Sequence, residues 1–360
     1  MKITDTIRYI GVDDLDIDLF ESQYVVPEGM SYNSYVILDE KIAVMDTVDA
    51  RKGEEWKANL TAVLDGRQPD YLVVHHMEPD HASLVAEAVN TYPAMKVVLS
   101  AAAAKMLPNF FEGTDFEGRV LSVKEGDSLS LGTHILQFIA APMVHWPEVM
   151  VTYDRTSETL FSADAFGTFG ALNGALFADE VDFDRDYLDE ARRYYTNIVG
   201  KYGVQVQQLL KKAGNLTISR ICPLHGPIWR ENLSAILEKY QLWSTYTPEE
   251  KGVVIAYASI YGNTELACQA LAHELSQQGV RDVKLLDLSR EHPSYVLAEA
   301  FRCSHLVFAS ATYNNNIFST MEHLLHELKA HNLSNRTVAL IQNGTWGPNA
   351  GKQMRELLEG

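Results

Sequence analysis

The sequence predicts an α/β protein with two domains, and three observations support this prediction. Residues 1–248 hold short apolar segments and turns flanked by helical stretches, which is typical of a sheet sandwich covered by helices. Residues 252–360 alternate apolar segments with helical segments, which indicates a doubly wound parallel sheet. A polar stretch with a proline, a glycine and a charged run, residues 245–252, separates the two patterns and marks the domain boundary.

The first domain is expected to contain a hairpin, because two apolar segments at residues 32–38 and 41–46 flank a turn at Asp39-Glu40. A continuous apolar run at residues 71–74 predicts a buried strand. The other elements expected in this domain are helices at residues 54–64, 82–90, 186–212 and 232–243, and strands at residues 96–100 and 149–153.

In the second domain, apolar runs alternate with amphipathic segments. Parallel strands that are covered on both faces are nearly continuous in apolar residues, and several segments here have that character. The elements predicted on this basis are strands at residues 253–258, 283–288, 305–309 and 338–342, with a first helix at residues 264–278. The sequence therefore predicts four parallel strands.

Composition excludes several classes of function. The 360-residue chain is 46% hydrophobic and carries a formal charge of −18, which argues against binding nucleic acid or an anionic membrane surface. No apolar run approaches the length of a membrane span, and the first residues lack the apolar segment of a signal peptide. Cys222, Cys268 and Cys303 are scattered and form no Cys-x-x-Cys pair, which fits a reducing cytoplasm and disfavours an iron–sulfur centre.

A cluster of metal-ligand residues follows the apolar run at residues 71–74. His76, Glu78, Asp80 and His81 lie within six residues, and such a density of ligand types is seldom accidental.

Three more ligand types, His145, Asp164 and His225, each follow an apolar segment, so we expect one site built from several strand ends. The seven groups can hold two metals with one bridging carboxylate. Imidazole and carboxylate without thiolate favour iron or manganese, although zinc is possible.

The series His-x-Glu-x-Asp-His followed by His, Asp and His resembles the ligand series of flavodiiron proteins at all seven positions. The resemblance implies that residues 1–248 form a metallo-β-lactamase-like αββα sandwich, with Glu78 in the place of a histidine of the zinc hydrolases. An added anionic oxygen ligand favours iron. The implied ligands are His76, Glu78 and His145 for one iron, Asp80, His81 and His225 for the other, and Asp164 as the bridge.

Three loops of the second domain follow predicted strands, where a doubly wound sheet binds its ligands. Residues 259–264 place hydroxyls and a glycine before a helix, which can hold a phosphate, but they lack the glycine pattern of dinucleotide sites and a Walker lysine. The three loops resemble those of flavodoxins. The FMN-binding residues that this resemblance implies are Ser259, Ile260, Tyr261, Gly262, Asn263, Thr264, Ala311, Thr312, Tyr313, Asn314, Asn315, Asn343, Gly344, Thr345, Trp346 and Gly347.

The aromatic side chains of Tyr313 and Trp346 offer flat faces for stacking on the flavin ring. A flavodoxin-like sheet has five strands, whereas four are predicted here, so the second domain is expected to lack the last strand and helix. An uncovered sheet edge would then be exposed. We expect this chain to bind FMN more weakly than a version extended by those elements.

The resemblance spans essentially the whole chain and implies a cytoplasmic oxidoreductase. It would reduce dioxygen to water, nitric oxide to nitrous oxide, or both, at a non-haem diiron site fed by FMN. It implies a small electron donor, such as rubredoxin or a reduced deazaflavin, and a head-to-tail homodimer or a dimer of such dimers. Tyr195 is the expected catalytic side chain near the ligands, with its neighbour Tyr194 and Trp146 as other candidates.

Two further functions remain open from the sequence. The first domain could hold two zinc ions and act as a hydrolase, although Glu78 and the flavin loops disfavour this. The chain could instead carry electrons on FMN while the metal site serves the structure, although seven ligand residues disfavour that. Within the family, the residues do not separate dioxygen from nitric oxide as the substrate.

Overall fold

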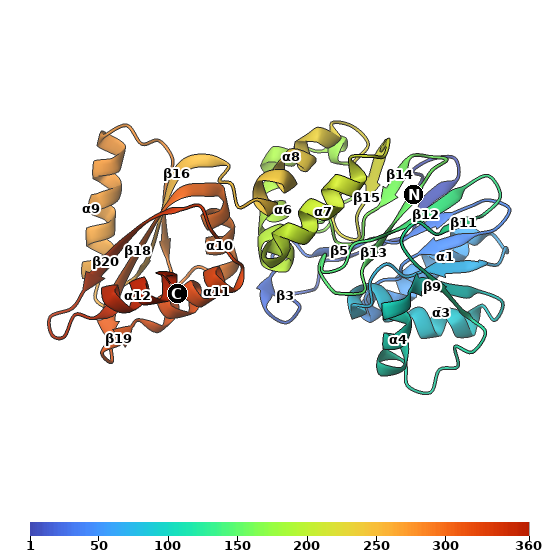
Figure 1. Ribbon diagram of the computed structural model, residues 1–360, viewed down its shortest axis with the longest axis horizontal. Helices are drawn as coiled ribbons and strands as arrows, with labels where there is room; N and C mark the ends of the chain where they lie inside the picture. Colours follow the sequence, from blue (N-terminus) through green and yellow to red (C-terminus); the bar gives the residue numbers. More distant parts are fainter. Residues whose placement is uncertain (360) are drawn as a thin grey trace. The chain divides into compact units, whose positions relative to one another are not determined.

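Two facing sheets form the core of the first unit in the computed structural model, which describes residues 1–359 (Figure 1). One sheet has six strands, in the order β1 (Ile7–Tyr9), β6 (Tyr35–Ile37), β7 (Ala43–Met45), β8 (Tyr71–Val73), β9 (Lys96–Ser100) and β10 (Val120–Val123). The other has five, in the order β11 (Ser128–Ser130), β12 (Ile135–Ala140), β13 (Met150–Asp154), β14 (Thr159–Phe161) and β15 (Arg220–Cys222). Residues of both sheets, such as Tyr35 and Phe138, meet in one buried cluster, so the predicted sandwich is confirmed.

Helices join the parallel strands of the first sheet, because a parallel pair needs a crossover connection. Strands β7, β8, β9 and β10 run parallel to one another, and the crossovers contain α1 (Gly53–Leu64), α3 (Val85–Thr91) and α4 (Ala101–Phe110). Helix α1 buries Trp56, Leu60 and Leu64, which share one face at helical spacing. The helix predicted at residues 82–90 corresponds to α3, which begins three residues later, and the short α2 (Pro79–Ala82) precedes it.

The chain leaves the first unit and returns to it. The first unit comprises residues 1–191 and 205–237, and the second comprises residues 192–204 and the chain from residue 238 onward. Residues 238–248, expected in the first domain, therefore cluster with the second unit. The smaller elements of the first unit are β2 (Val12–Asp14) paired with β5 (Met30–Tyr32), β3 (Leu19–Phe20) paired with β4 (Tyr24–Val25), and α5 (Phe183–Asp186).

The single helix predicted over residues 186–212 is broken where the chain passes between the units. Its parts are α6 (Leu188–Tyr194), a π-helical turn (Tyr195–Val199), a 3₁₀ turn (Gly200–Tyr202) and α7 (Gly203–Ala213). The β-branched residues of the π-helical turn and two nearby glycines disfavour a regular helix. A Cβ atom on Gly203 would lie 2.4 Å from the carbonyl oxygen of Ser244, at the end of α8 (Leu233–Ser244).

The second unit is a doubly wound sheet, as predicted. Its parallel strands have the order β17 (Val283–Asp287), β16 (Glu250–Ala258), β18 (Cys303–Tyr313) and β20 (Thr337–Asn343), and the short β19 (Asn316–Ile317) pairs antiparallel with β18. Helix α9 (Asn263–Gln277) lies on one side of this sheet, and α10 (Pro293–Arg302) and α11 (Ser319–Ala330) lie on the other (Figure 1). Helix α12 (Ala350–Glu359) follows β20.

Strand β20 lies at an edge of the sheet as described over residues 1–359. It pairs with β18 on one side, and Thr337, Val338 and Ala339 are exposed. An exposed edge presents unpaired backbone groups to solvent. The four parallel strands expected from the sequence are all present.

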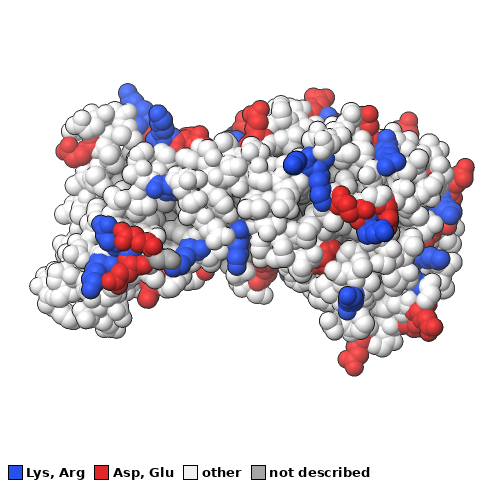
Figure 2. Space-filling view, viewed as in Figure 1, with Lys and Arg blue, Asp and Glu red and all other residues white. Residues whose placement is uncertain are grey.

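Charged side chains of both signs are dispersed over the face of the molecule in Figure 2. On the face shown in Figure 2, basic side chains are interspersed with acidic ones and do not form one continuous patch. The formal charge of −18 disfavours a nucleic-acid interface. Among residues 1–359, no helix combines the length and the apolar character that crossing a bilayer requires.

Candidate metal centre and cofactor pocket

The segment that carries four of the ligand residues is held rigidly on both sides. It leaves β8 at His75, whose backbone N–H donates to Asp46 Oδ1 (2.8 Å) and whose ring bonds to Asp46 Oδ2 and to Thr152 Oγ1 (2.7 Å). At its far end, the carbonyl oxygen of His81 accepts hydrogen bonds from the backbone N–H (2.9 Å) and hydroxyl (2.6 Å) of Thr47. Pro79 starts the short helix α2, whose turn directs Asp80 and His81 inward, where both are buried.

The first group of ligand atoms gathers around one oxygen of Asp164. Glu78 Oε2 lies 3.0 Å from Nε2 of His76 and 3.0 Å from Nε2 of His145. The same two ring nitrogens lie 3.3 and 3.6 Å from Asp164 Oδ2. These four residues can direct one atom each to a common point, since the atoms lie within 4.8 Å of one another.

The second group gathers around the other oxygen of Asp164. Asp80 Oδ2 lies 3.2 Å from His81 Nε2 and 3.3 Å from His225 Nε2. Asp164 Oδ1 lies 3.2 Å from His81 Nε2 and 3.8 Å from His225 Nε2. One carboxylate thus presents an oxygen to each of two ligand groups, which is the arrangement expected of a bridge between two metals.

Several atoms of the centre lack the hydrogen bonds that buried polar atoms normally make. Both carboxylate oxygens of Asp80 and of Asp164, and Nε2 of His81, are buried without a hydrogen-bond partner among the described residues. Burying such groups without a partner is costly. Two divalent cations would satisfy them, and the nitrogen and oxygen donors match the preferences of iron. The residues present therefore fit a dinuclear metal site.

The electrostatics of the centre also favour bound positive charge. Burial alone would lower the pKa of His76, but Asp164 and two glutamates outweigh it and raise that pKa well above its usual range. Burial would also lower the pKa of His81, but the carboxylates of Asp80 and Asp164 outweigh burial and raise this pKa to about 9. Burial would raise the pKa values of Glu78 and Asp164, but the neighbouring imidazoles hold both well below their usual range.

Two of the four histidines have a partner for the ring nitrogen that points away from the centre. His76 Nδ1 lies 2.8 Å from Glu148 Oε1, and His225 Nδ1 lies 2.7 Å from the carbonyl oxygen of Ser31. Such partners fix the tautomer and the orientation of a ligand ring. We did not predict Glu148 or Ser31 from the sequence, because both are distant in the chain from the histidines they contact and belong to no motif.

The loop that carries His225 is clamped by residues almost two hundred positions earlier. The Asn33 side-chain amide donates to the carbonyl oxygens of Pro223 (2.9 Å) and Gly226 (2.8 Å). The hydroxyl of Ser31 accepts from the backbone N–H of Gly226 (2.6 Å). These bonds hold His225 in place from β5 and the segment after it.

The aromatic residues suggested beside the ligands have different positions. Trp146 meets the ring of His76 edge to face at a centroid distance of 5.0 Å, so it does lie at the ligand cluster. Tyr195 belongs to the second unit, where its ring packs against Tyr240 and Trp243 at 4.9 and 5.3 Å. Tyr194 is buried in the same unit. These contacts of Tyr195 all lie within the second unit, and its expected catalytic role stays a prediction.

A cavity of about 430 Å³ opens beside the metal centre. Its wall includes the ligand residues Glu78 and Asp80 together with Tyr32, Arg51 and the loop between β3 and β4. The cavity therefore gives a small molecule access to Glu78 and Asp80.

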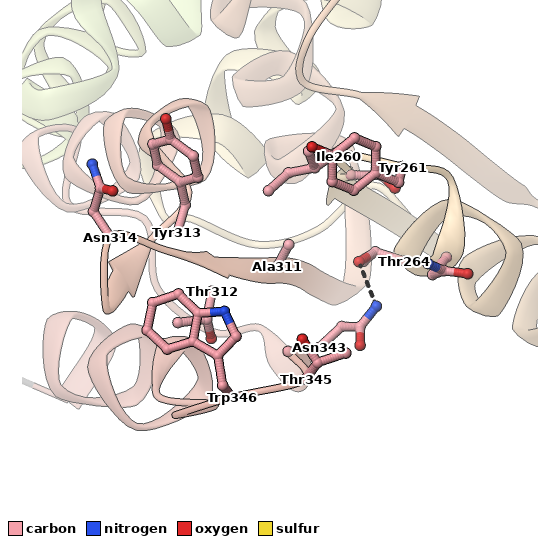
Figure 3. Close-up of a pocket in the computed structure, with 13 residues that line it drawn as sticks. Ile260, Tyr261, Thr264, Ala311, Thr312, Tyr313, Asn314, Asn343, Thr345 and Trp346 are labelled. Atoms are coloured by element: carbon pink, nitrogen blue, oxygen red, sulfur yellow. Dashed lines mark hydrogen bonds between the residues drawn. The ribbon is translucent and has the colours of Figure 1, made fainter.

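The second unit has a pocket of about 290 Å³ at the carboxyl ends of its strands (Figure 3). It is formed by the loops after β16, β18 and β20, and the helix N-terminus of α9 adjoins it. Thirteen of the sixteen residues expected at the flavin line it: Ser259, Ile260, Tyr261, Asn263, Thr264, Ala311, Thr312, Tyr313, Asn314, Asn343, Gly344, Thr345 and Trp346.

The three remaining residues, Gly262, Asn315 and Gly347, lie in the same loops but not in the pocket wall. All three have positive φ angles, of 84°, 59° and 52°, and so shape the turns. Asn343 Nδ2 donates to Thr264 Oγ1 at 3.3 Å and joins the first and third loops.

Two aromatic side chains of the pocket, Tyr313 and Trp346, are placed where a flat ligand could stack on them. Tyr313 and Trp346 lie on either side of the strand that carries Ala311 and Thr312 (Figure 3). Their side chains are 49% and 71% exposed, which leaves large apolar faces available to a ring system.

The comparisons with known proteins cover nearly the whole chain. A family model described as ODP family beta lactamase matches residues 30–226. The chain is 34% identical to the nitric oxide reductase of Moorella thermoacetica, over 100% of this chain and 89% of that protein. It is 30% identical to the anaerobic nitric oxide reductase flavorubredoxin of Vibrio vulnificus, over 98% of this chain and 71% of that protein. The structure of rubredoxin oxygen:oxidoreductase from Desulfovibrio gigas superposes with a TM-score of 0.93 at 29% identity, covering 100% of this chain and 89% of that one.

Fold and site together define a protein with a lactamase-like domain, a candidate dinuclear metal centre and a flavodoxin-like second domain. With the relatives just described, this assignment becomes specific: the chain belongs to the flavodiiron protein family. The resemblance seen in the sequence and the predicted fold class are thereby confirmed. The relatives are oxidoreductases by name, which supports an enzymatic function for this chain.

Proposed function

We propose that this protein reduces dioxygen to water, nitric oxide to nitrous oxide, or both, at two non-haem irons that receive electrons from FMN. One observation carries the proposal: the two oxygens of Asp164 face two separate groups of ligand atoms. The names of the relatives, which include nitric oxide reductases and an oxygen oxidoreductase, support the same reaction class.

In this proposal each ligand group holds one iron. The first iron would be held by His76, Glu78 and His145, and the second by Asp80, His81 and His225, while Asp164 would offer one oxygen to each group. When bound, two ferrous ions would supply two electrons and adjacent binding positions for small diatomic molecules. The protein contributes fixed ligand positions, through His75 and Thr47, and an entry cavity beside Glu78.

The pocket of the second unit would hold FMN. Residues 259–264 surround the start of α9 and can bind the phosphate through hydroxyls and backbone N–H groups. Tyr313 and Trp346 would stack on the isoalloxazine ring. FMN can accept electrons singly and pass them on, so a small one-electron donor such as rubredoxin, or a reduced deazaflavin, would complete the chain of transfer. The three buried, unpaired cysteines are in keeping with a cytoplasmic location.

Expression with ample iron is expected to give about two irons per chain and little zinc, because the donor set is rich in carboxylates and free of thiolate. Elemental analysis of the purified protein measures this directly. Mostly zinc together with hydrolase activity would instead establish the di-zinc alternative. The electron-carrier alternative predicts a different result. The protein would hold two irons and FMN, but after reduction it would consume neither dioxygen nor nitric oxide when each gas is added.

Trp346→Ala is expected to weaken FMN binding by about 10-fold to 100-fold, since stacking on one aromatic ring contributes roughly 1–3 kcal/mol. Flavin fluorescence during titration of the apoprotein gives the dissociation constant. Trp346→Phe is the matched control, because it keeps a flat apolar face and should retain most of the affinity. Equal affinity in the alanine variant and the unaltered protein would show that Trp346 does not stack on FMN.

We also propose a head-to-tail homodimer, in which the FMN of one subunit serves the irons of the other. Subunits with His81→Ala and subunits with Thr264→Ala and Trp346→Ala should each be inactive. Mixed dimers should recover activity, because one intact flavin then faces one intact metal centre. Demonstrated subunit exchange without recovery would favour transfer within one chain.

A further inference from the structure

A buried glutamate outside the ligand set contacts the metal centre directly. Glu148 precedes β13 and is 2% exposed. Its Oε1 lies 2.8 Å from His76 Nδ1 and accepts the backbone N–H of Met77 at 2.9 Å. The carboxylate therefore holds the ring of His76 so that Nε2 points to Glu78 and Asp164.

The backbone of Glu148 is fixed from two directions. Its carbonyl oxygen accepts a hydrogen bond from the hydroxyl of Ser100 (2.8 Å), at the end of β9. Two residues on, the N–H of Met150 donates to the carbonyl oxygen of His75 (3.1 Å). The carboxylate and the ligand segment it contacts are thus parts of one rigid assembly.

The two ligand groups offer the same kinds of donor atoms but differ in the hydrogen-bond partners of their histidine Nδ1 atoms. Each offers two imidazoles, one carboxylate and one oxygen of Asp164. Behind His76 stands the carboxylate of Glu148, whereas behind His225 stands the neutral carbonyl of Ser31. The Nδ1 of His81 is buried without a hydrogen-bond partner among the described residues.

The second oxygen of Glu148 indicates that its charge has a use beyond hydrogen bonding. Oε2 is buried and has no hydrogen-bond partner within residues 1–359. A glutamine could accept the same two hydrogen bonds without a buried negative charge, which is costly when unpaired. Positive charge held by the first ligand group would offset that cost.

We propose that Glu148 is a positioning residue that fixes the orientation of His76 and, through its negative charge, makes the group His76, Glu78, His145 the tighter of the two metal sites. This inference rests on the proposed dinuclear site. It predicts that the metals enter in order, the first iron going to the group backed by Glu148.

Anaerobic equilibrium dialysis of the apoprotein against Fe(II) tests this order. The unaltered protein should bind two irons in two separate steps. Glu148→Gln should weaken the tighter step about 10-fold and leave the weaker step unchanged, since partners behind a ligand histidine typically account for 10–100-fold in affinity. Glu148→Asp keeps the negative charge but shortens the side chain. The Fe(II) affinity of its tighter step should therefore lie between those of the unaltered protein and Glu148→Gln. A role in hydrogen bonding alone predicts the opposite order, with the glutamine variant binding better than the aspartate variant.

A matched control comes from a second buried carboxylate–histidine pair in the same unit. Asp154 Oδ2 lies 2.7 Å from His134 Nδ1, and neither residue has a described contact with the ligands. Asp154→Asn should leave both binding steps unchanged even if the protein loses some stability. A weakening of the tighter step in Asp154→Asn as large as that in Glu148→Gln would assign the effect to general loss of structure and overturn the proposal.

The spectrum of the half-loaded protein gives a readout that a structural role would not change. With one equivalent of ⁵⁷Fe(II), the unaltered protein should show one dominant Mössbauer doublet, whereas Glu148→Gln should show two of similar size. Identical spectra and affinities in the two proteins would overturn the role of Glu148 while leaving the dinuclear site intact. Failure of the unaltered protein to bind two irons would overturn the proposed function itself.

Discussion

Asp164→Asn is expected to lower gas-reductase turnover by more than about 100-fold, which exceeds the loss typical for residues that only orient a ligand. Each oxygen of Asp164 faces a different ligand group, at 3.3 Å from His76 Nε2 and at 3.2 Å from His81 Nε2. An asparagine keeps one oxygen but replaces the other with an amide nitrogen, which cannot ligate a cation. One iron would lose its shared ligand, and the pair would lose a negative charge between two cations.

Turnover of each gas by the reduced protein, measured beside the iron content per chain, tests this expectation. Tyr195→Phe is the control, because the hydroxyl of Tyr195 is buried and has no hydrogen-bond partner among residues 1–359. That variant should lose much less activity than Asp164→Asn. Turnover near normal in Asp164→Asn would remove Asp164 from the metal centre.

Gly226→Ala should destabilise the apoprotein by about 2–4 kcal/mol and impair iron binding at the second ligand group. Gly226 directly follows the ligand His225 and has a φ angle of 76°, which disfavours any residue with a Cβ atom. An added Cβ would lie 2.0 Å from Thr168 Cγ2, closer than atoms can approach. The backbone would have to move, and His225 would move with it.

Two variants separate the clash from the backbone strain. Gly66 has a similar φ angle of 81°, but the space around its Cβ position is open. Gly66→Ala should therefore lower the free energy of unfolding by only about 1 kcal/mol. Adding Thr168→Ser to Gly226→Ala removes the clashing methyl group, while the serine can keep the hydrogen bond to the carbonyl oxygen of Phe169. Urea unfolding should therefore show partial recovery in the double variant. Equal losses for the two alanine variants would contradict a role for the clash.

Much of the fold followed from local patterns that survive in the tertiary structure. The apolar runs correctly predicted the parallel strands β16, β17, β18 and β20. In β16 and β18 the apolar run reflects burial, whereas β20 keeps one at an exposed edge. The break between residues 186 and 212 did not follow from hydrophobic periodicity, which does not register the two nearby glycines or the close approach of Gly203 to Ser244. Periodicity measures one segment at a time and does not detect a neighbouring helix.

The sequence by itself determined the two-domain α/β class, because that class depends on the order of apolar and helical segments. It also determined the ligand-type residues from His76 to His225 and the three loops of the pocket, because these are recognised by residue types that follow a predicted strand. Only the tertiary structure decided which oxygen of Asp164 faces which group, that Glu148 stands behind His76, and that Asn33 holds the loop of His225. It also decided that Tyr195 packs with Tyr240 inside the second unit. These relations join residues far apart in the chain, and packing against the rest of the fold, rather than local propensity, sets them.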